Sequence, residues 1–372
     1  MNYATALDVG KRKRDQGRIN EDSVAVNVLE DGHRDSHRKC GIFVLADGAG
    51  GSQAGDIASY VTTVEVTRRV TQHCWDERQL TEVVDAVEPD RPGGPELSAG
   101  AVGDPLATVD DETVQRILRR AIQDAHTRLL EVIGDLRLQE AYSTVVAALV
   151  VENRLHYAWV GDSRAYVVNL GADRPEEQRL SPLTRDHSEV ARLLEQGDID
   201  EVEAQVHQHG NRITRALGGL PSENASHSTV EVDAASVPLF GDDVVLLASD
   251  GLTDAFTGAS RLHQEYLEAS DQTSVSERIM EASVTAADIR EVILESPDLE
   301  TAAERFVTLT NDRGGKDNVS LVLFRDPSLE PAVPGSLPPR TYAADAEAVA
   351  SWETVKQSPE DRPDGPAGDG SF

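Results

Sequence analysis

The chain has 372 residues and a formal net charge of −31 at pH 7, with 66 acidic residues against 35 basic ones. This length is sufficient for one large domain or two small ones with a sizeable core. An acidic surface lacks the basic footprint that nucleic-acid binding requires, and the longest apolar run, 145–151, is too short to cross a bilayer. We therefore expect neither nucleic acid nor a membrane as a partner.

The charged residues are unusual in kind as well as in number. Lysine occurs at only five positions, so that 30 of the 35 basic residues are arginine. A large negative charge is tolerable where molar salt shortens the Debye length to about 3 Å. The composition is therefore similar to that of proteins from a high-salt cytoplasm, such as those of halophilic archaea, and an ordinary acidic enzyme is the alternative.

The start of the chain and the cysteines bear on location. No charged segment followed by an apolar one opens the sequence, so no secretory signal is expected. The two cysteines, Cys40 and Cys74, form neither a disulfide framework nor a CxxC metal motif. We expect a cytoplasmic protein.

The N-terminal part predicts strands over 4–8, 23–29 and 41–44, because apolar residues alternate or run together there. The basic run Lys11-Arg12-Lys13-Arg14 lies between the first two strands. It is too short for a nucleic-acid patch, and indicates either a solvated loop or a local collar that attracts phosphate. A glycine-rich loop then leads into a helix over 56–72, where apolar residues recur at helical spacing.

Residues 88–110 are rich in proline, glycine and acidic side chains, which predicts a flexible insertion. An amphipathic helix follows, capped by Asp110 or Asp111, in which His126 is expected to be structural. Further strands are expected at 144–151, 155–160, 164–169, 244–249 and 319–324, with a short helix at 188–196 and mostly helices over 257–312.

The composition of residues 327–372, rich in proline, glycine and aspartate, predicts a disordered acidic tail after a folded domain of residues 1–326. Such a tail could recruit a partner or simply keep the protein soluble, and solubility is the simpler role in so acidic a chain.

Aspartates mark the ends of three predicted strands. The strand before Asp47-Gly48 and the strand before Asp250-Gly251 both end on an Asp-Gly pair, and Asp317-Asn318 opens the last strand. Glycine lets the backbone turn sharply beside a ligand, and carboxylates suit Mg2+ or Mn2+. One Asp-Gly pair alone could be only a turn, but the recurrence indicates that the three aspartates converge at one edge of a sheet.

Eight short motifs follow one another between residues 17 and 324: Asn20-Glu21-Asp22, Asp47-Gly48-Ala49-Gly50-Gly51, Ser143-Thr144, Gly161-Asp162-Ser163-Arg164, Asp186-His187, Arg215-Ala216-Leu217-Gly218, Ser249-Asp250-Gly251-Leu252-Thr253-Asp254 and Gly315-Lys316-Asp317-Asn318. This ordered set resembles the metal-dependent protein phosphatases, the PPM or type 2C Ser/Thr family, in their bacterial and archaeal form. The resemblance implies an α+β fold, a four-layer α-β-β-α sandwich of two antiparallel sheets flanked by helices, with a metal centre at one edge.

The resemblance also implies which residues hold two Mn2+ or Mg2+ ions. Asp47 would bridge the ions and Gly48 would offer its carbonyl oxygen to one of them. Asp250 and Asp317 would complete the first site, and Glu21 would hold the second ion, through water. Hard ions with oxygen ligands and several retained waters are consistent with such a set.

Three further acidic residues match the family pattern. Asp22 would support the metal ligands without binding an ion itself. Asp162 and Asp254 match positions that can hold a third, more weakly bound ion. For Asp162 a turn aspartate is an equal alternative. Two ions close together can lower the pKa of a bridging water and neutralise a phosphate during in-line attack.

The arginine that binds phosphate departs from the family pattern. It usually lies four residues before the equivalent of Glu21, where this chain has Gly17. Arg18, three residues before, would take the role after a small shift of the loop, or Arg14 or Arg12 would reach in instead. The planar guanidinium suits this role because it binds two phosphate oxygens at once.

Ala49 stands where some relatives have a histidine that is a candidate general acid. Protonation of the leaving group then falls to a metal-bound water or another residue. His187 is conceivable, but it stands at the entry to the flap expected at about 186–215, where a structural role is commoner.

The resemblance implies hydrolysis of phosphoserine and phosphothreonine on substrates of a Ser/Thr kinase, by a monomer, with Asp47, Asp250, Asp317 and Arg18 as the catalytic set. The alternatives are a catalytically weak regulator of the same fold that binds phosphoproteins, and a hydrolase of small phosphate esters. Retention of all the metal carboxylates favours an active enzyme.

Overall fold

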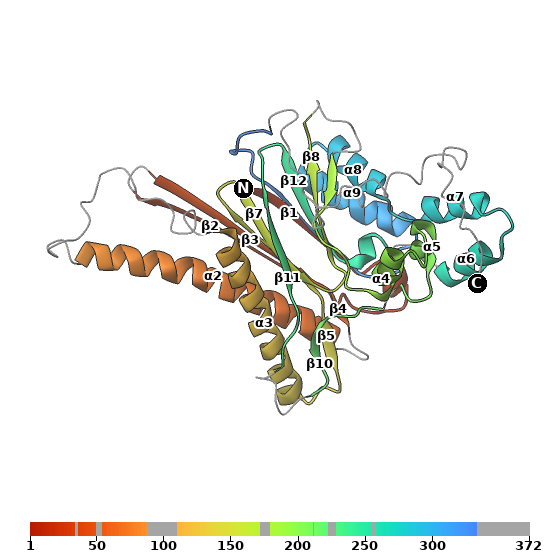
Figure 1. Ribbon diagram of the computed structural model, residues 1–372, viewed down its shortest axis with the longest axis horizontal. Helices are drawn as coiled ribbons and strands as arrows, with labels where there is room; N and C mark the ends of the chain where they lie inside the picture. Colours follow the sequence, from red (N-terminus) through yellow and green to blue (C-terminus); the bar gives the residue numbers. More distant parts are fainter. Residues whose placement is uncertain are drawn as a thin grey trace, which may run out of the picture.

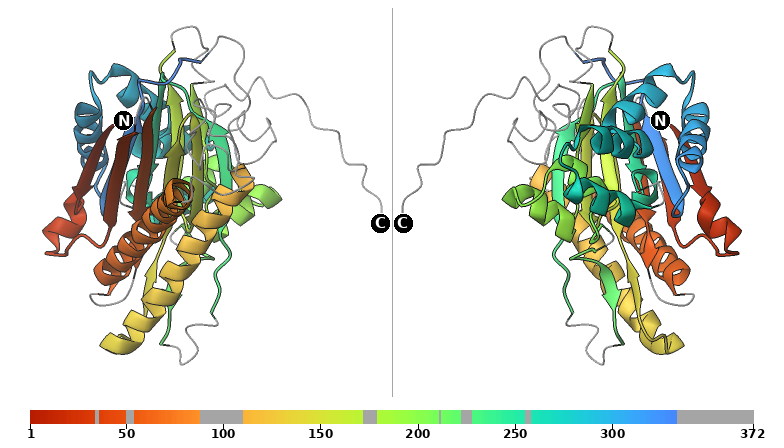
Figure 2. Two further views of the ribbon diagram at one scale, coloured as in Figure 1. Left: turned by 90° about the vertical axis from the view of Figure 1, so that its left-hand side faces the viewer. Right: turned by 90° about the vertical axis from the view of Figure 1, so that its right-hand side faces the viewer.

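The structure is a computed structural model and describes residues 1–33, 36–49, 54–87, 110–171, 179–210, 212–221, 228–254 and 258–332. Two five-stranded antiparallel sheets pack face to face, and helices cover the outer face of each (Figures 1 and 2). This is the four-layer α-β-β-α sandwich that the sequence predicts.

The strands of the sheets are ordered as follows. The first sheet has the order β1 (Asn2–Asp8), β13 (Val319–Arg325), β12 (Asp243–Ala248), β8 (Arg164–Asn169) and β9 (Leu180–Pro182). The second has the order β11 (Asp233–Pro238), β7 (Arg154–Val160), β6 (Val145–Val151), β3 (Ser36–Ala46) and β2 (Ser23–His33). A small third sheet joins β10 (Leu217–Gly219), β5 (Ala141–Ser143) and β4 (Gly48–Ala49).

Alternation along the strands divides the interior into layers. On β3, Ile42 and Val44 face the helices, whereas Phe43 and Leu45 face the other sheet. Neighbouring side chains of a strand point to opposite faces, so a strand buried on both faces reads as a continuous apolar run. The Phe43 ring stacks on Phe324 of β13 with centroids 3.8 Å apart, which joins the two sheets at their centre.

The helices fall into three groups. The second sheet is covered by α2 (Gly55–Val87) and α3 (Asp111–Leu136), and the first by α8 (Ala286–Glu295) and α9 (Leu299–Asp312) (Figure 1). The third group lies at one end of the molecule and comprises α4 (Glu189–Gln196), α5 (Glu201–Val206), α6 (Ala259–Glu268) and α7 (Thr273–Ala282) (Figure 1). Two short helices, α1 (Lys11–Asp15) and the 3-10 helix η3 (Asp250–Leu252), lie at the sheet ends.

Most predicted elements are confirmed, including the hairpin of β6 and β7 and the capping of α3 by Asp110, whose Oδ1 accepts the Thr113 N–H at 2.8 Å. The basic run predicted as a loop instead forms α1, and α5 lies in a region for which no helix was predicted. Strands β2 and β3 are longer than predicted because their polar ends pair with each other, from Glu30–Lys39 to His33–Ser36. Such mutual pairing leaves no apolar signal in the sequence.

The described chain stays packed beyond residue 326, the predicted end of the folded domain. The carbonyl of Glu330 accepts the Gly241 N–H at 2.9 Å, the Ala332 N–H donates to Asp242 at 3.0 Å, and Leu329 packs against the core between the sheets. The packed chain therefore continues to residue 332. The remainder of the predicted tail, 333–372, and the predicted insertion up to residue 109 lie outside the described residues.

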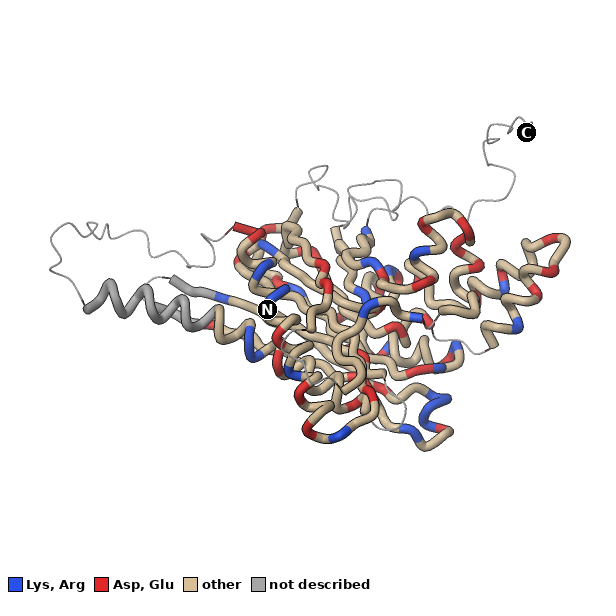
Figure 3. The backbone as a smooth tube through the Cα atoms, turned by 60° about the horizontal axis from the view of Figure 1, so that its bottom comes forward, with Lys and Arg blue, Asp and Glu red and all other residues tan. Residues whose placement is uncertain are grey.

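Acidic and basic residues are interspersed along the backbone in the view of Figure 3. Arginines on helices pair with glutamates one turn away, such as Arg128 with Glu131 at 2.9 Å and Arg192 with Glu189 at 2.6 Å. Exposed pairs of this kind contribute only about 0.3–0.5 kcal/mol each and weaken in salt. Among the described residues, no helix combines the length and the apolar character needed to cross a membrane.

Candidate metal centre

Strand register brings the predicted metal ligands to one edge of the sandwich. Ser23 of β2 pairs with Ala46 of β3, so the residues just before β2 lie beside those just after β3. Ala248 of β12 pairs with Leu321 of β13, which places the end of β12 beside the start of β13. The predicted ligands occupy these four positions: Glu21, Asp47, Asp250 and Asp317, with Asp22 beside Glu21.

The Ser143-Thr144 motif holds Asp47 in place. The Asp47 N–H donates to Thr144 Oγ1 at 3.0 Å, and the Thr144 N–H donates to the Asp47 carbonyl at 2.8 Å. Thr144 Oγ1 also hydrogen-bonds Ser163 Oγ at 2.7 Å. Two sequence motifs thus fix the backbone of Asp47 through contacts that do not use its carboxylate.

Glycine is required at Gly48 by the close approach of three backbone segments. A Cβ on Gly48 would overlap the carbonyl oxygens of Gly55 and Glu21. Ser59 Oγ donates to that same Glu21 carbonyl at 2.6 Å, which ties the Glu21 loop to the start of α2. A side chain at Gly48 would therefore displace the loop that carries Glu21.

The carboxylates at this edge raise one another's pKa. Burial, followed by the charges of Asp22 and Asp250, raises the pKa of Asp47 well above its ordinary value. Burial, followed by the charges of Asp162 and Asp317, does the same to the pKa of Asp250. Both residues keep partial contact with solvent, so an ion can reach them. Without a cation, mutual repulsion and desolvation disfavour their charged forms.

Asp22 lies next to Glu21 and, like it, is buried. It is 8% exposed, and neither of its carboxylate oxygens has a hydrogen-bond partner among the described residues. Burial raises its pKa to about 6, and the nearby hydroxyls of Ser249 and Ser320 offset part of that rise. The Asp250 Oδ1 is likewise without a partner in the described chain. Buried carboxylate oxygens without donors fit a hard divalent cation.

Lys13 enters the centre, which the sequence did not reveal. Its ammonium forms an ion pair with Asp317, lies 3.3 Å from Glu21 Oε2 and donates to Asn318 Oδ1 at 3.0 Å. Burial alone would lower the pKa of Lys13, but the charges of Asp317 and Glu21 raise it overall. Lys13 is thus an internal counter-ion; the sequence singled out the basic run that contains it, but not its pairing with the predicted ligands.

Asn318 connects the loop before β2 to the start of β13. Its Oδ1 accepts the Glu21 N–H at 3.0 Å, and its Nδ2 donates to the Val9 carbonyl at 3.0 Å and the Ile19 carbonyl at 3.4 Å. The side chain is buried, so that each of these partners would be difficult to replace by water. Asn318 therefore positions Glu21.

The three candidate arginines differ in their surroundings. Arg18 Nη2 lies 3.2 Å from Glu21 Oε2 and its side chain is half exposed. Arg14 forms an ion pair with Asp8 at 2.5 Å, away from the ligand set. Arg12 donates its backbone N–H to the Gly315 carbonyl at 2.9 Å, which anchors α1. Of the three side chains, that of Arg18 contacts a predicted metal ligand, Glu21.

Asp162 and Asp254, predicted for a third ion, lie beside Asp250. Burial, and then the charge of Asp186, raises the pKa of Asp162 to about 7. Burial also raises the pKa of Asp254, although Lys316 forms an ion pair with it. Both charges contribute to the raised pKa of Asp250, so the first and third predicted sites adjoin.

His187 has a structural role in this arrangement. Its Nδ1 accepts the Gly161 N–H at 3.1 Å, and its ring stacks on Trp159 with centroids 6.0 Å apart. The neighbouring Asp186 receives two short hydrogen bonds from Arg164, at 2.6 and 2.9 Å, which join the two motifs. His187 therefore orders the turn that carries Asp162, as expected for the structural alternative.

A family model described as protein phosphatase 2C matches residues 9–284, about three quarters of the chain. The chain belongs to the protein phosphatase 2C family. Among curated relatives of this family, the serine/threonine phosphatase stp of Listeria monocytogenes is 28% identical over 315 residues, which cover 84% of this chain and 93% of that protein. The protein phosphatase PhpP of Streptococcus pneumoniae is 26% identical over 331 residues, covering 87% and 96%.

Solved structures of 2C-type phosphatases share the fold. The Mycobacterium tuberculosis serine/threonine phosphatase PstP/Ppp superposes with a TM-score of 0.54 at 24% identity, covering 87% of this chain and 98% of that one. The catalytic domain of PstP in complex with two manganese ions gives a TM-score of 0.51 at 24% identity, covering 87% and 96%. The α-β-β-α sandwich is thus a fold that this chain shares with solved structures of serine/threonine phosphatases.

Proposed function

We propose that this chain is a metal-dependent protein serine/threonine phosphatase that hydrolyses phosphoserine and phosphothreonine. The observation that carries the proposal is the edge of the sandwich, where Glu21, Asp47, Asp250 and Asp317 meet beside buried carboxylate oxygens that have no donor within the described chain. The family model and the curated Ser/Thr phosphatases among its relatives support the same activity.

The donor set fits two Mn2+ or Mg2+ ions. Asp47, the Gly48 carbonyl, Asp250, Asp317 and Glu21 would hold them, since the ligands offered are oxygen atoms, which these hard ions prefer. The related PstP structure is described with two manganese ions. When bound, such ions lower the pKa of a shared water and neutralise phosphate charge.

Two basic residues would bind the substrate phosphate. Arg18 is half exposed and next to Glu21, and its guanidinium can bind two phosphate oxygens. Lys13 pairs with Glu21 and Asp317 and must release these oxygens before they can bind cations. Its ammonium is then free to face the phosphate as a second, point-like positive charge. Arg14 is held by Asp8, and we assign it no contact with substrate.

A third ion would lie between Asp162, Asp254 and Asp250, because each of the first two raises the pKa of the third. Lys316 pairs with Asp254 and would compete with that ion, consistent with weaker binding than at the other two sites. Burial keeps the pKa of Asp162 at about 7, so that this site should fill more readily above neutral pH.

The setting of the enzyme is inferred from sequence and relatives. We place it in the cytoplasm, as a monomer acting on substrates of a Ser/Thr kinase, with residues 1–332 as its catalytic domain and residues 186–215 as a flap that shapes access. The net charge of −31 supports function in molar salt.

The test is hydrolysis of a phosphothreonine peptide by protein stripped of metal with EDTA, assayed with and without Mn2+ at low and molar salt. We expect activity only with metal, and near-complete loss in Asp47→Asn. The matched control Asp298→Asn changes an exposed capping aspartate of α9 and should keep full activity. Folded protein without turnover under any metal or salt, or an active Asp47→Asn, would overturn the proposal.

A further inference from the structure

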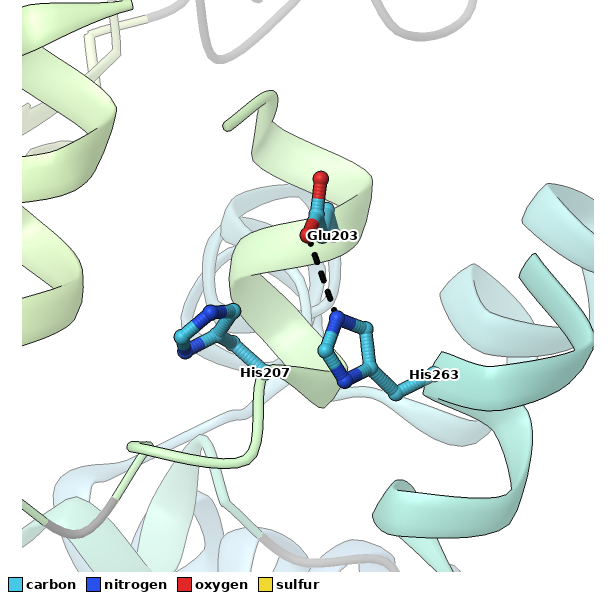
Figure 4. A group of neighbouring side chains, drawn as sticks. All are labelled: Glu203, His207 and His263. Atoms are coloured by element: carbon cyan, nitrogen blue, oxygen red, sulfur yellow. Dashed lines mark hydrogen bonds and ion pairs between the residues drawn. The ribbon is translucent and has the colours of Figure 1, made fainter. Parts of the chain in front are cut away.

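A second cluster of metal-ligating side chains lies outside the carboxylate edge. It consists of Glu203 on α5, His207 directly after α5, and His263 on α6, whose potential ligand atoms all lie within 4.8 Å of one another. Figure 4 shows the three side chains converging from the two helices. None of them belongs to the motifs that define the phosphatase centre.

The two helices that carry the cluster are held together without any ion. Val202 and Val206 of α5 pack against Tyr266 of α6 and Ile279 of α7 in a small separate core. The Tyr266 hydroxyl donates to Asp200, the capping residue of α5, at 2.6 Å. The ligand positions are therefore fixed by packing, and an ion entering the cluster need not order the backbone.

Within the cluster, one contact is already made. His263 Nε2 lies 3.1 Å from Glu203 Oε1, and the side chains of these residues are 10% and 17% exposed. The His207 ring lies beside the His263 ring, with centroids 5.1 Å apart, and its Nδ1 accepts the N–H of His209 at 3.2 Å. A Glu–His hydrogen bond alone would explain two of these residues, but not the third side chain that faces them.

We propose that Glu203, His207 and His263 form a binding site for Zn2+ or a similar borderline transition metal, with water in the remaining position. Two imidazoles and one carboxylate are a ligand set that zinc accepts, usually with a fourth, open position. Coordination through His207 Nε2 would move the ring proton to Nδ1. Nδ1 would then no longer accept the hydrogen bond from the His209 N–H. Imidazole binds Mn2+ more weakly than Zn2+, so the preference should be opposite to that of the carboxylate edge.

The location indicates what a bound ion would do. Glu203 and His207 lie in the flap segment, whereas His263 lies on α6, which follows the segment containing Asp250 and Asp254. One ion would thus crosslink two segments 60 residues apart in the chain, within the group of helices at this end of the molecule. This inference goes beyond the phosphatase assignment and does not depend on turnover.

The test measures Zn2+ binding to the full chain with the carboxylate edge saturated by Mg2+. Competition with a chromophoric chelator should reveal one Zn2+ site in the wild type. Affinity should fall by at least about 100-fold in His263→Gln, His207→Gln and Glu203→Gln, because even changes behind a metal ligand cost 10–100-fold. The control Gln208→Ala alters an exposed residue between His207 and His209 and should bind Zn2+ as the wild type does.

A second measurement guards against variants that misfold. In wild-type protein with labelled histidine, Zn2+ should shift the imidazole resonances of His207 and His263, while that of His126, a buried residue of α3, stays unchanged. Weaker binding by His209→Ala would support the site with His209 as the fourth ligand, and unchanged binding would support water there. Absence of a Zn2+ site, equal affinity in the three ligand variants, or unmoved His207 and His263 resonances would overturn the proposal.

Discussion

Replacement of Asp22 by asparagine should change how the stability of the metal-free protein depends on pH. Asp22 is 8% exposed, both of its carboxylate oxygens are without a hydrogen-bond partner in the described residues, and burial raises its pKa from the ordinary 3.8 to about 6. The folded protein therefore holds the Asp22 proton more tightly than the unfolded chain does. Asparagine carries no such proton, so that the pH dependence due to this site disappears.

The size of the effect follows from the pKa shift. A rise of about 2.2 units corresponds to roughly 3 kcal/mol, at 1.36 kcal/mol per unit. Because the folded pKa is raised, the free energy of unfolding falls as pH rises from about 4 to about 6, and stays low above that. The buried asparagine amide costs about 1–3 kcal/mol at every pH. The quantity to compare is therefore the free energy of unfolding of Asp22→Asn minus that of the wild type. This difference should rise by roughly 1.5 kcal/mol between pH 5 and pH 7.5.

Urea unfolding in EDTA at fixed salt, followed by tryptophan fluorescence, measures this difference, since Trp159 is fully buried. The control is Asp288→Asn. Burial would raise the pKa of Asp288, but hydrogen bonds from Arg313 and Thr285 lower it overall. Its contribution to stability is complete above pH 3.8 and is lost only below it, so this variant should lose equal stability at pH 5 and pH 7.5. A flat difference for Asp22→Asn over the same range would refute the reasoning.

Two further variants test how the loop before β2 is held. Asn318→Ala removes the acceptor of the Glu21 N–H and should lower the free energy of unfolding by about 2–4 kcal/mol and weaken Mn2+ binding. Urea unfolding and Mn2+ titration measure these two effects, and an unchanged Mn2+ affinity would contradict the positioning role of Asn318. Lys13→Met removes the ammonium that pairs with Asp317 and should lower the Mn2+ concentration for half-saturation while reducing peptide turnover. Mn2+ binding, followed by electron paramagnetic resonance, measures the change in affinity. Weaker Mn2+ binding by the variant would count against Lys13 as a competitor of the metal.

The features that the sequence predicted well are those fixed over short distances along the chain. The Asp-Gly pairs after β3 and at the start of η3 mark both the end of a strand and a predicted metal ligand, and Asp110 caps α3 next to the apolar stripe it precedes. Strands β3 and β6 were visible as continuous apolar runs because both of their faces are buried. The convergence of the three aspartates was predicted from their recurrence at strand ends.

The features that were missed depend on contacts between distant residues. Lys13 and Asn318 are 305 residues apart, and the Glu203–His263 contact spans 60 residues. No periodicity encodes such pairs, because in the sequence each of these residues reads as an ordinary polar side chain. The six-residue helix α5 was likewise hidden, since its stability comes from packing on α6 rather than from its own polar sequence.

Lys13 partly neutralises the carboxylates at the acidic edge. Gathering buried carboxylates costs free energy unless a positive charge accompanies them, and the raised pKa values of Asp47 and Asp250 reflect that cost. A lysine on the short helix α1 supplies one charge on a flexible stem, enough to lessen the repulsion but too little to cancel it. Divalent ions can displace it because they bring more charge to the same oxygens. On the proposed function, the released ammonium would stay beside the substrate phosphate, so that a single residue would stabilise the metal-free edge and then bind the substrate.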